Sequence, residues 1–121
     1  MNILVLEDNE DNRRLIVKRL SRLGHQVDEA ATVAAARSAL ENSCPDVLLL
    51  DIHLHDGDGL EALSQWRGTL NLPPVIVCSA MAYPEDRVRA EKAGCVGYLT
   101  KPINLRTLVQ DIEELLRAAQ A

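Results

Sequence analysis

Several apolar runs in this chain end in polar side chains that can carry out chemistry. Glu7 and Asp8 follow the run at residues 3–6, Asp51 follows residues 47–50, Ser79 follows residues 75–78, and Lys101 comes shortly after residues 96–99. Carboxylates that share one site repel each other unless a cation offsets their charge, and a small set of oxygen ligands suits Mg²⁺. With Mg²⁺ and a lysine neutralising phosphoryl oxygens, a carboxylate such as Asp51 can attack phosphorus and form an acyl phosphate. These residue types therefore indicate phosphate chemistry, with Ser79 as a hydrogen-bond donor to the new group.

The segments between these residues predict how a fold positions them. Short β-branched or leucine-rich runs alternate with amphipathic segments, which is typical of βαβ units around a parallel sheet. Right-handed crossovers bring the carboxyl ends of parallel strands to one edge, where open α/β sheets bind ligands. We therefore predict an α/β fold with all of these polar residues in one crevice. The pattern alone leaves open which strands are neighbours.

Helix boundaries are marked clearly in the first half of the chain. Asn9 is the expected N-cap of a first helix that ends before Gly24, and Thr32 is the expected N-cap of a second helix. The polar segment at residues 26–30 is expected at the edge of the sheet. The residues expected to be buried on these two helices are Leu15, Ile16, Leu20, Leu23, Val33, Ala36 and Leu40.

Three further helices are expected in the second half. One begins near Asp58, which is its expected N-cap, one has Pro84 in its first turn, and the last is capped by Asn104. The helix at Pro84 is rich in charged residues around Val88 and Ala93, so we expect it to pack lightly.

Length and composition exclude several classes of protein. The 121 residues fit one domain, and a net charge of -5 with a sequence pI near 5.1 argues against direct binding to nucleic acid. No apolar run is long enough to cross a membrane and no secretion signal is visible, so we expect a cytoplasmic protein. Cys44, Cys78 and Cys95 are odd in number and widely spaced, which is typical of reduced thiols in a core.

Four motifs together resemble the receiver domain of two-component response regulators. They are Glu7-Asp8-Asn9, Asp51, Ser79-Ala80 and Lys101-Pro102, and the resemblance extends over essentially all 121 residues. It implies a flavodoxin-like (βα)5 fold, a three-layer sandwich whose parallel five-stranded sheet has the order 2-1-3-4-5 and is flanked by five helices. It also implies that residues 1–121 are a single receiver domain, with no effector domain in this chain.

The resemblance implies a role for each site residue. Asp51 accepts a phosphoryl group from a histidine kinase or a histidine phosphotransfer protein, and Lys101 contacts a phosphoryl oxygen. Mg²⁺, with Mn²⁺ as a substitute, is held by Asp8, Asp51 and the backbone carbonyl of His53. Glu7 reaches the ion through water.

The resemblance also implies a conformational switch. Ser79 moves toward the phosphate and Tyr98 turns inward, which remodels the surface of the fourth helix, fifth strand and fifth helix. That surface then binds a downstream protein target, an effector domain outside this chain, or a second copy in a phosphorylation-dependent dimer. The protein is a signalling domain that assists its own phosphorylation and dephosphorylation, and it is not expected to be an enzyme.

Three positions are notable against the family pattern. His55 stands where the family often has proline, Met81 occupies a position that influences phosphate access in relatives, and the Lys101-Pro102 position commonly has a cis peptide. Because no cysteine pair accompanies them, His53 and His55 are interpreted as surface loop residues and not as transition-metal ligands.

Two other functions use similar residues. A phosphatase of the haloacid dehalogenase type also forms an aspartyl phosphate, but it needs a second aspartate two residues after the nucleophile, where His53 stands. The main alternative is a receiver-like module that is not phosphorylated and serves only for docking or dimerisation, although such a module has no need to retain clustered acids.

Overall fold

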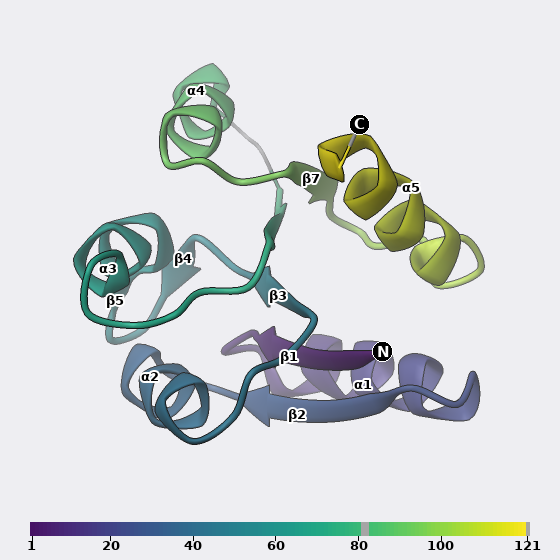
Figure 1. Ribbon diagram of the computed structural model, residues 1–121. Helices are drawn as coiled ribbons and strands as arrows, with labels where there is room; N and C mark the ends of the chain where they lie inside the picture. Colours follow the sequence, from purple (N-terminus) through teal and green to yellow (C-terminus); the bar gives the residue numbers. More distant parts are fainter. Residues whose placement is uncertain (81–82, 121) are drawn as a thin grey trace.

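The computed structural model describes residues 1–80 and 83–120, and its centre is a parallel sheet (Figure 1). The strands of this sheet are β1 (Asn2–Leu6), β2 (Gln26–Ala30), β3 (Val47–Leu50), β6 (Val75–Ser79) and β7 (Gly97–Thr100). Their order is β2-β1-β3-β6-β7. This is the expected order 2-1-3-4-5, because β6 and β7 are the fourth and fifth strands of the main sheet along the chain.

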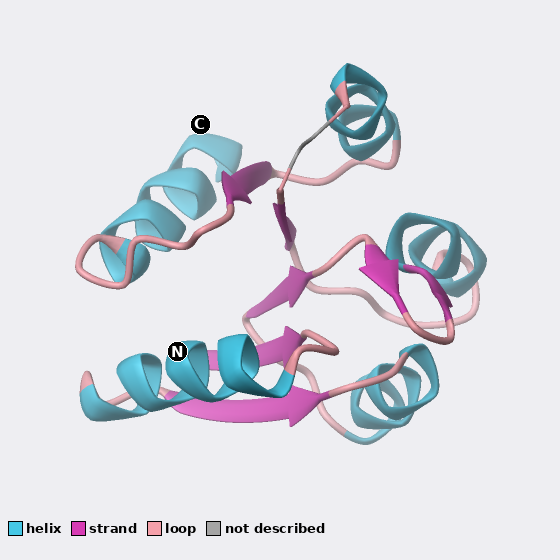
Figure 2. Ribbon diagram, turned by 180° about the vertical axis from the view of Figure 1, so that it is seen from behind, coloured by secondary structure: helices cyan, strands magenta, loops and turns pink. Residues whose placement is uncertain are grey.

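Helices cover both faces of the sheet and complete three layers (Figure 1; Figure 2). On one face lie α1 (Glu10–Arg22) and α5 (Leu108–Gln120), and on the other lie α2 (Val33–Asn42), α3 (Gly59–Trp66) and α4 (Pro84–Lys92). Each face has its own core of buried side chains, one containing Leu20 and Ile112 and the other containing Leu63 and Trp66. The predicted α/β fold class is therefore confirmed.

Coverage of both faces explains the burial of the central strands. Every residue of β3 and β6 is buried, and so are residues 3–6 of β1. The edge strand β2 instead exposes Gln26, Asp28 and Glu29, as its polar sequence predicts. Strands buried on both faces need continuous apolar sequences, which is why the central strands were easy to recognise and the polar edge strand was less so.

Three of the predicted N-caps make the expected hydrogen bonds. The Asn9 side chain accepts from the backbone N–H of Asn12 at 2.9 Å, and Thr32 Oγ1 accepts from Ala35 at 3.0 Å. Asp58 Oδ1 accepts from the two N–H groups at residues 60 and 61. These side chains satisfy amides that the first turn of a helix leaves without a partner.

The expected start of the last helix was wrong. Asn104 Oδ1 accepts from the backbone N–H of Arg106 at 3.0 Å, but this bond closes a turn and α5 begins only at Leu108. Asparagine forms the same short bond in turns and at N-caps, so its presence alone does not distinguish the two.

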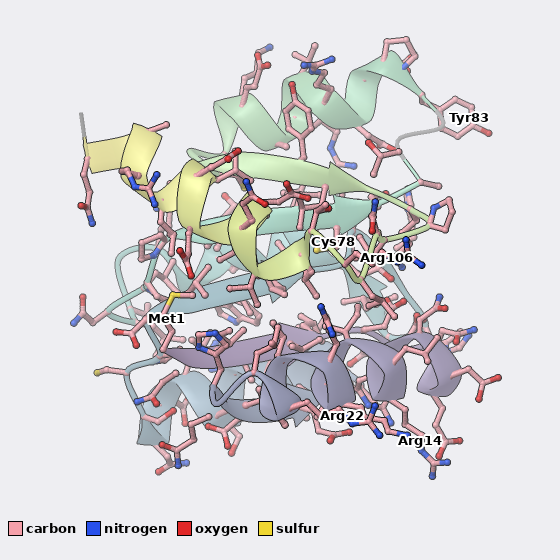
Figure 3. The ribbon with its side chains drawn as sticks, turned by 90° about the vertical axis from the view of Figure 1, so that its right-hand side faces the viewer. Met1, Arg14, Arg22, Cys78, Tyr83 and Arg106 are labelled. Atoms are coloured by element: carbon pink, nitrogen blue, oxygen red, sulfur yellow. The ribbon has the colours of Figure 1, made fainter. Side chains whose placement is uncertain are left out.

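Two side chains expected to be buried are exposed, Leu15 at 53% and Leu23 at 47%. On α4, which was expected to pack lightly, Val88 is 48% exposed, while Ala90 and Asp86 are buried. Cys78 is buried among the core side chains (Figure 3). Cys44 is exposed, so the core interpretation was wrong for Cys44.

A short hairpin follows β3 that the sequence analysis did not predict. It consists of β4 (His53–Leu54) and β5 (Gly57–Asp58), which are antiparallel and pair His53 with Asp58. It connects Asp51 to α3. Elsewhere in the described chain, the Lys101-Pro102 peptide is cis. None of the described helices is both long enough and apolar enough to cross a membrane.

Candidate functional site

Three carboxyl groups meet at the carboxyl edge of the sheet. Glu7 and Asp8 follow β1, and Asp51 follows the neighbouring strand β3, where its backbone N–H donates to Leu6 O at 3.0 Å. One carboxylate oxygen from each of the three lies within 4.8 Å of the others. The parallel register of β1 and β3 therefore brings together residues that are far apart in the sequence.

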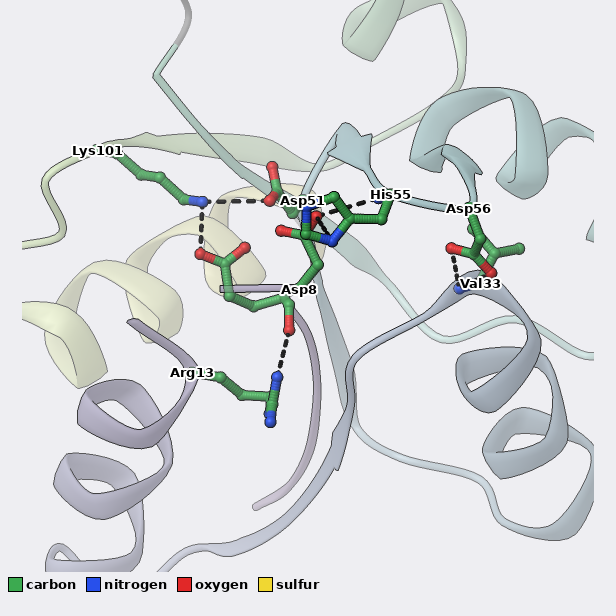
Figure 4. Close-up of polar contacts among 8 residues, drawn as sticks. Asp8, Arg13, Val33, Asp51, His55, Asp56 and Lys101 are labelled. Atoms are coloured by element: carbon green, nitrogen blue, oxygen red, sulfur yellow. Dashed lines mark hydrogen bonds and ion pairs between the residues drawn. The ribbon is translucent and has the colours of Figure 1, made fainter. Parts of the chain in front are cut away.

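The Lys101 ammonium faces the carboxylates of this cluster (Figure 4). Lys101 Nζ donates to Glu7 Oε1 at 2.6 Å and to Asp51 Oδ2 at 3.2 Å. The backbone N–H of Lys101 also donates to Ser79 O at 2.9 Å, because β7 pairs with β6 up to Thr100. The end of β7 thus fixes the backbone from which the lysine side chain reaches back to β1 and β3.

The charges of the cluster shift its pKa values in opposite directions. Burial and the adjacent Glu7 carboxylate raise the pKa of Asp51 from 3.8 to about 7, although the Lys101 ammonium opposes this. Burial alone would raise the pKa of Glu7, but its contacts with Asp51 and Lys101 outweigh burial and lower it. Burial would likewise lower the pKa of Lys101, and the two carboxylates raise it instead. The site therefore holds more negative charge than Lys101 alone offsets.

One carboxylate oxygen of the cluster has no donor when both buried acids are ionised. Glu7 is 2% exposed, and within the described chain its Oε2 atom has no hydrogen-bond partner. A proton shared with Asp51 or a bound cation supplies the missing partner. An all-oxygen donor set with one oxygen in need of a cation fits Mg²⁺.

The remaining predicted residues lie around this cluster. Asp8 Oδ2 accepts from the backbone N–H of His55 at 3.1 Å, and His53 opens the hairpin next to Asp51. Ser79 is 2% exposed at the end of β6. Tyr98 lies on β7, with the guanidinium carbon of Arg87 4.4 Å from the centre of its ring. Met81 lies outside the described residues.

Several positioning residues were missed by sequence reasoning. Arg13 donates from Nη1 to Glu7 O at 3.0 Å (Figure 4). Its Nε also donates to Glu29 at 2.9 Å, so Arg13 ties α1 to the ends of two strands. A Cβ added at Gly59 would overlap the backbone oxygen of Asp51. In the sequence, this close approach of Gly59 to the Asp51 backbone was signalled by a glycine directly after the N-cap residue Asp58.

Charged residues of α4 contact the hairpin that follows Asp51. Arg89 Nη2 donates to Asp58 Oδ1 at 2.8 Å, and His53 Nε2 lies 3.3 Å from Asp86 Oδ2. Asp86 is 5% exposed although it belongs to a polar helix. The helical spacing of Asp86 and Arg89 was visible in the sequence, but their partners on the hairpin were not.

The strand order and the acidic cluster opposite a lysine define the receiver class of two-component signalling proteins. A model of this family, described as the response regulator receiver domain, matches residues 3–113. The chain belongs to this family.

Known proteins similar to the chain agree with this assignment. The transcriptional regulatory protein PhoP of Escherichia coli (strain K12) is 32% identical over 117 residues, which are 97% of this chain and 52% of that protein. The virulence transcriptional regulatory protein PhoP of Salmonella typhimurium is 33% identical over the same length and coverage. The chain spans about half the length of these curated relatives.

Solved structures are similar over almost the whole chain. A two-component response regulator from Clostridium difficile has a TM-score of 0.89 and 25% identity, and the match covers 100% of this chain and 99% of that one. A response regulator receiver domain protein (CheY-like) from Methanospirillum hungatei JF-1 has a TM-score of 0.88 and 28% identity, with 98% and 95% covered.

Proposed function

We propose that residues 1–121 act as one receiver domain in which Asp51 accepts a phosphoryl group from the phosphohistidine of a kinase or phosphotransfer protein. The observation that carries this proposal is the Lys101 ammonium 3.2 Å from Asp51 Oδ2, beside two further acids at the carboxyl edge of the sheet. In such a pair the buried carboxylate is the nucleophile for phosphoryl transfer. The adjacent cation neutralises part of the charge on the phosphoryl oxygens.

In this reaction an oxygen of the Asp51 carboxylate attacks phosphorus. A new phosphorus–oxygen bond forms, and the bond to the donor nitrogen breaks with its electrons leaving on the imidazole. Lys101 neutralises an oxygen of the transferring group, and Ser79 donates a hydrogen bond to it after the transfer. Asp51 must be ionised to attack, so any interaction that lowers its raised pKa also raises the fraction that can react.

The same proposal assigns a divalent cation to the acidic cluster. Asp8, Asp51 and the backbone carbonyl of His53 would hold Mg²⁺, or Mn²⁺ in its place, and Glu7 would reach it through water. The ion would supply positive charge at the phosphoryl oxygens. The buried Glu7 Oε2 without a partner in the described chain supports this assignment.

A groove beside the site suits docking of the donor. It has a volume of about 390 Å³ and is lined by residues of α1 and of the segment after β7, which are Asn12, Leu15, Ile16, Lys101, Pro102, Ile103 and Leu105. The exposed Leu15 is part of this lining, which gives a role to an apolar side chain left in solvent. A donor seated here lies next to Lys101.

The output of the proposed switch is the surface formed by α4, β7 and α5. Tyr98 contacts Arg87 of α4 in the present structure, so an inward turn of its ring breaks this contact and changes the surface of the helix. The proposed partners are a downstream protein, an effector domain, or a second copy bound in a phosphorylation-dependent dimer.

Acetyl phosphate and Mg²⁺ test the reaction without the unidentified donor. We expect intact mass to show one phosphate adduct on the wild type and on Asp28→Asn, whose side chain is exposed on β2, but not on Asp51→Asn. A chelator should abolish the adduct. Mg²⁺ binding without an adduct on folded wild type would instead favour a docking module or strict dependence on phosphohistidine.

A further inference from the structure

The groove between α1 and the segment after β7 combines an apolar wall with two polar side chains. Of the described residues that line it, the polar ones are Asn12 and Lys101, and the apolar ones are Leu15, Ile16, Pro102, Ile103 and Leu105. Lys101 is charged and already binds the carboxylates of Glu7 and Asp51 (Figure 4). Asn12 is neutral. A phosphoryl donor that enters the groove therefore meets one cation and one uncharged amide.

Asn12 lies where the groove meets the acidic cluster. It is exposed in the first turn of α1, and its backbone N–H donates to Asn9 Oδ1 at 2.9 Å, so the helix cap uses only the main chain of Asn12. Burial would raise the pKa of Glu7, but its contacts with Asp51 and Lys101 outweigh burial and lower it. The Asn12 amide adds to this lowering, which places the amide close to the Glu7 carboxylate.

A carboxamide at this place suits a donor that carries an N–H. An amide has an NH₂ group that donates and a carbonyl oxygen that accepts, whereas an ammonium only donates and a carboxylate only accepts. Asn12 Nδ2 is therefore the group that suits Glu7, and Oδ1 is left as an acceptor for the groove. Among the described lining residues, Asn12 supplies the side-chain acceptor that Lys101 lacks.

We propose that Asn12 binds the imidazole of the phosphohistidine donor, with Oδ1 accepting from the ring N–H, and so selects imidazole donors over acyl phosphates. The inference rests on the proposed transfer of a phosphoryl group to Asp51. The flat faces of the ring pack against the apolar wall of the groove, and Lys101 stays with the phosphoryl oxygens.

The role of Asn12 follows from how the donor ring leaves. As an oxygen of Asp51 bonds to phosphorus, the phosphorus–nitrogen bond breaks and its electron pair stays on the ring nitrogen. A ring that carries a proton on its other nitrogen leaves as neutral imidazole, without a developing negative charge. By accepting from this N–H, Asn12 favours the protonated donor and fixes its orientation. Acetyl phosphate leaves as acetate and has no N–H for this contact.

Two small donors, phosphoimidazole and acetyl phosphate, test the proposal on the full chain with Mg²⁺. Intact mass follows adduct formation, and the measured quantity is the ratio of the two second-order rate constants. We expect Asn12→Ala to lower this ratio about tenfold, because it slows the reaction with phosphoimidazole and leaves that with acetyl phosphate unchanged. Asn12→Asp keeps an acceptor oxygen, so its ratio should equal or exceed that of the wild type.

The matched control is Asn42→Ala, which makes the same change at an exposed residue of α2 on the opposite face of the sheet and should leave the ratio unchanged. The inference is overturned if Asn12→Ala slows both donors equally, since Asn12 would then only support Glu7, or if the ratio stays the same. Adducts from both donors on the wild type would leave the proposed function intact in those cases. A folded wild type that reacts with neither donor would overturn the proposed function and this inference together.

Discussion

Lys101 Nζ lies 2.6 Å from Glu7 Oε1, closer than its 3.2 Å to Asp51 Oδ2, although Glu7 and Lys101 are 94 positions apart. The lysine is therefore held mainly by a carboxylate other than the proposed phosphoacceptor. This arrangement keeps the ammonium at the site without depending on Asp51 alone. It also makes the lysine important for stability as well as for reactivity.

Replacing this lysine should destabilise the protein. Lys101→Met leaves the buried Glu7 and Asp51 carboxyls without their cation, and breaking a buried pair in this way costs about 2 to 4 kcal/mol. Urea unfolding at pH 8 in chelator measures the loss. The control Lys18→Met, on the exposed face of α1, should change the free energy of unfolding by less than about 0.5 kcal/mol.

A second substitution tests whether the unpaired Glu7 carries this cost. In Glu7→Gln/Lys101→Met one of the two uncompensated carboxylates is gone, so the double variant should be more stable than Lys101→Met alone. Equal stability of the two variants would show that Lys101 acts through packing instead of charge.

The raised pKa of Asp51 makes the metal-free protein sensitive to pH. Because the folded chain retains this proton up to about 7 while the ordinary pKa is 3.8, the free energy of unfolding should fall as pH rises between these values. The fall is on the order of 4 kcal/mol at most. Asp51→Asn removes the ionisation, so it should be more stable than the wild type at pH 8 in chelator and nearly equal to it at pH 4.

Thermal unfolding across this pH range checks the prediction. Mg²⁺ should raise the melting temperature of the wild type at pH 8 and raise that of Asp51→Asn less, because the variant has lost one proposed ligand. A wild-type pH profile that Asp51→Asn reproduces would contradict the assignment of the shift to Asp51.

Gly59 should tolerate no side chain, for a steric reason. A Cβ there would overlap the Asp51 backbone oxygen and approach its carbonyl carbon, so Gly59→Ala must displace the phosphoacceptor or the start of α3. We expect a loss above about 2 kcal/mol. Gly68→Ala is the control, since it has open space but a φ of +94°, and should cost about 1 kcal/mol. Urea unfolding measures the free energy of unfolding of both variants. Equal losses would argue against a clash between a Cβ at residue 59 and the Asp51 backbone.

The predictable parts of the structure are those that short segments specify by themselves. The apolar runs that became β1, β3 and β6 are buried along nearly their whole length, and Asn9 forms the expected cap bond. The placement of polar side chains directly after these runs was enough to predict that they lie together at one edge of the sheet. The strand order came from the family resemblance, because crossover connections of similar length allow more than one order.

The parts that were missed depend on contacts between distant segments. The hairpin β4–β5 has two residues in each strand, which is too short to leave an alternating pattern. Asp86 reads as an ordinary exposed acid of a polar helix, and its burial follows from packing against that hairpin. Leu15 has the spacing of a core residue but lines a groove.

The contact of Arg89 with Asp58 should restrain α4 against the hairpin that follows Asp51. Burial would raise the pKa of Asp58, but the backbone N–H of Glu61 and the Arg89 guanidinium lower it, so the carboxylate stays ionised for this contact. Arg89→Ala should cost only about 0.5 to 1 kcal/mol, because both side chains are partly exposed. Hydrogen exchange should nevertheless become faster in residues 84–92 and stay unchanged in β3. Lys92→Ala on the same helix is the control, and an equal effect of the two variants would show that α4 opens independently of the hairpin.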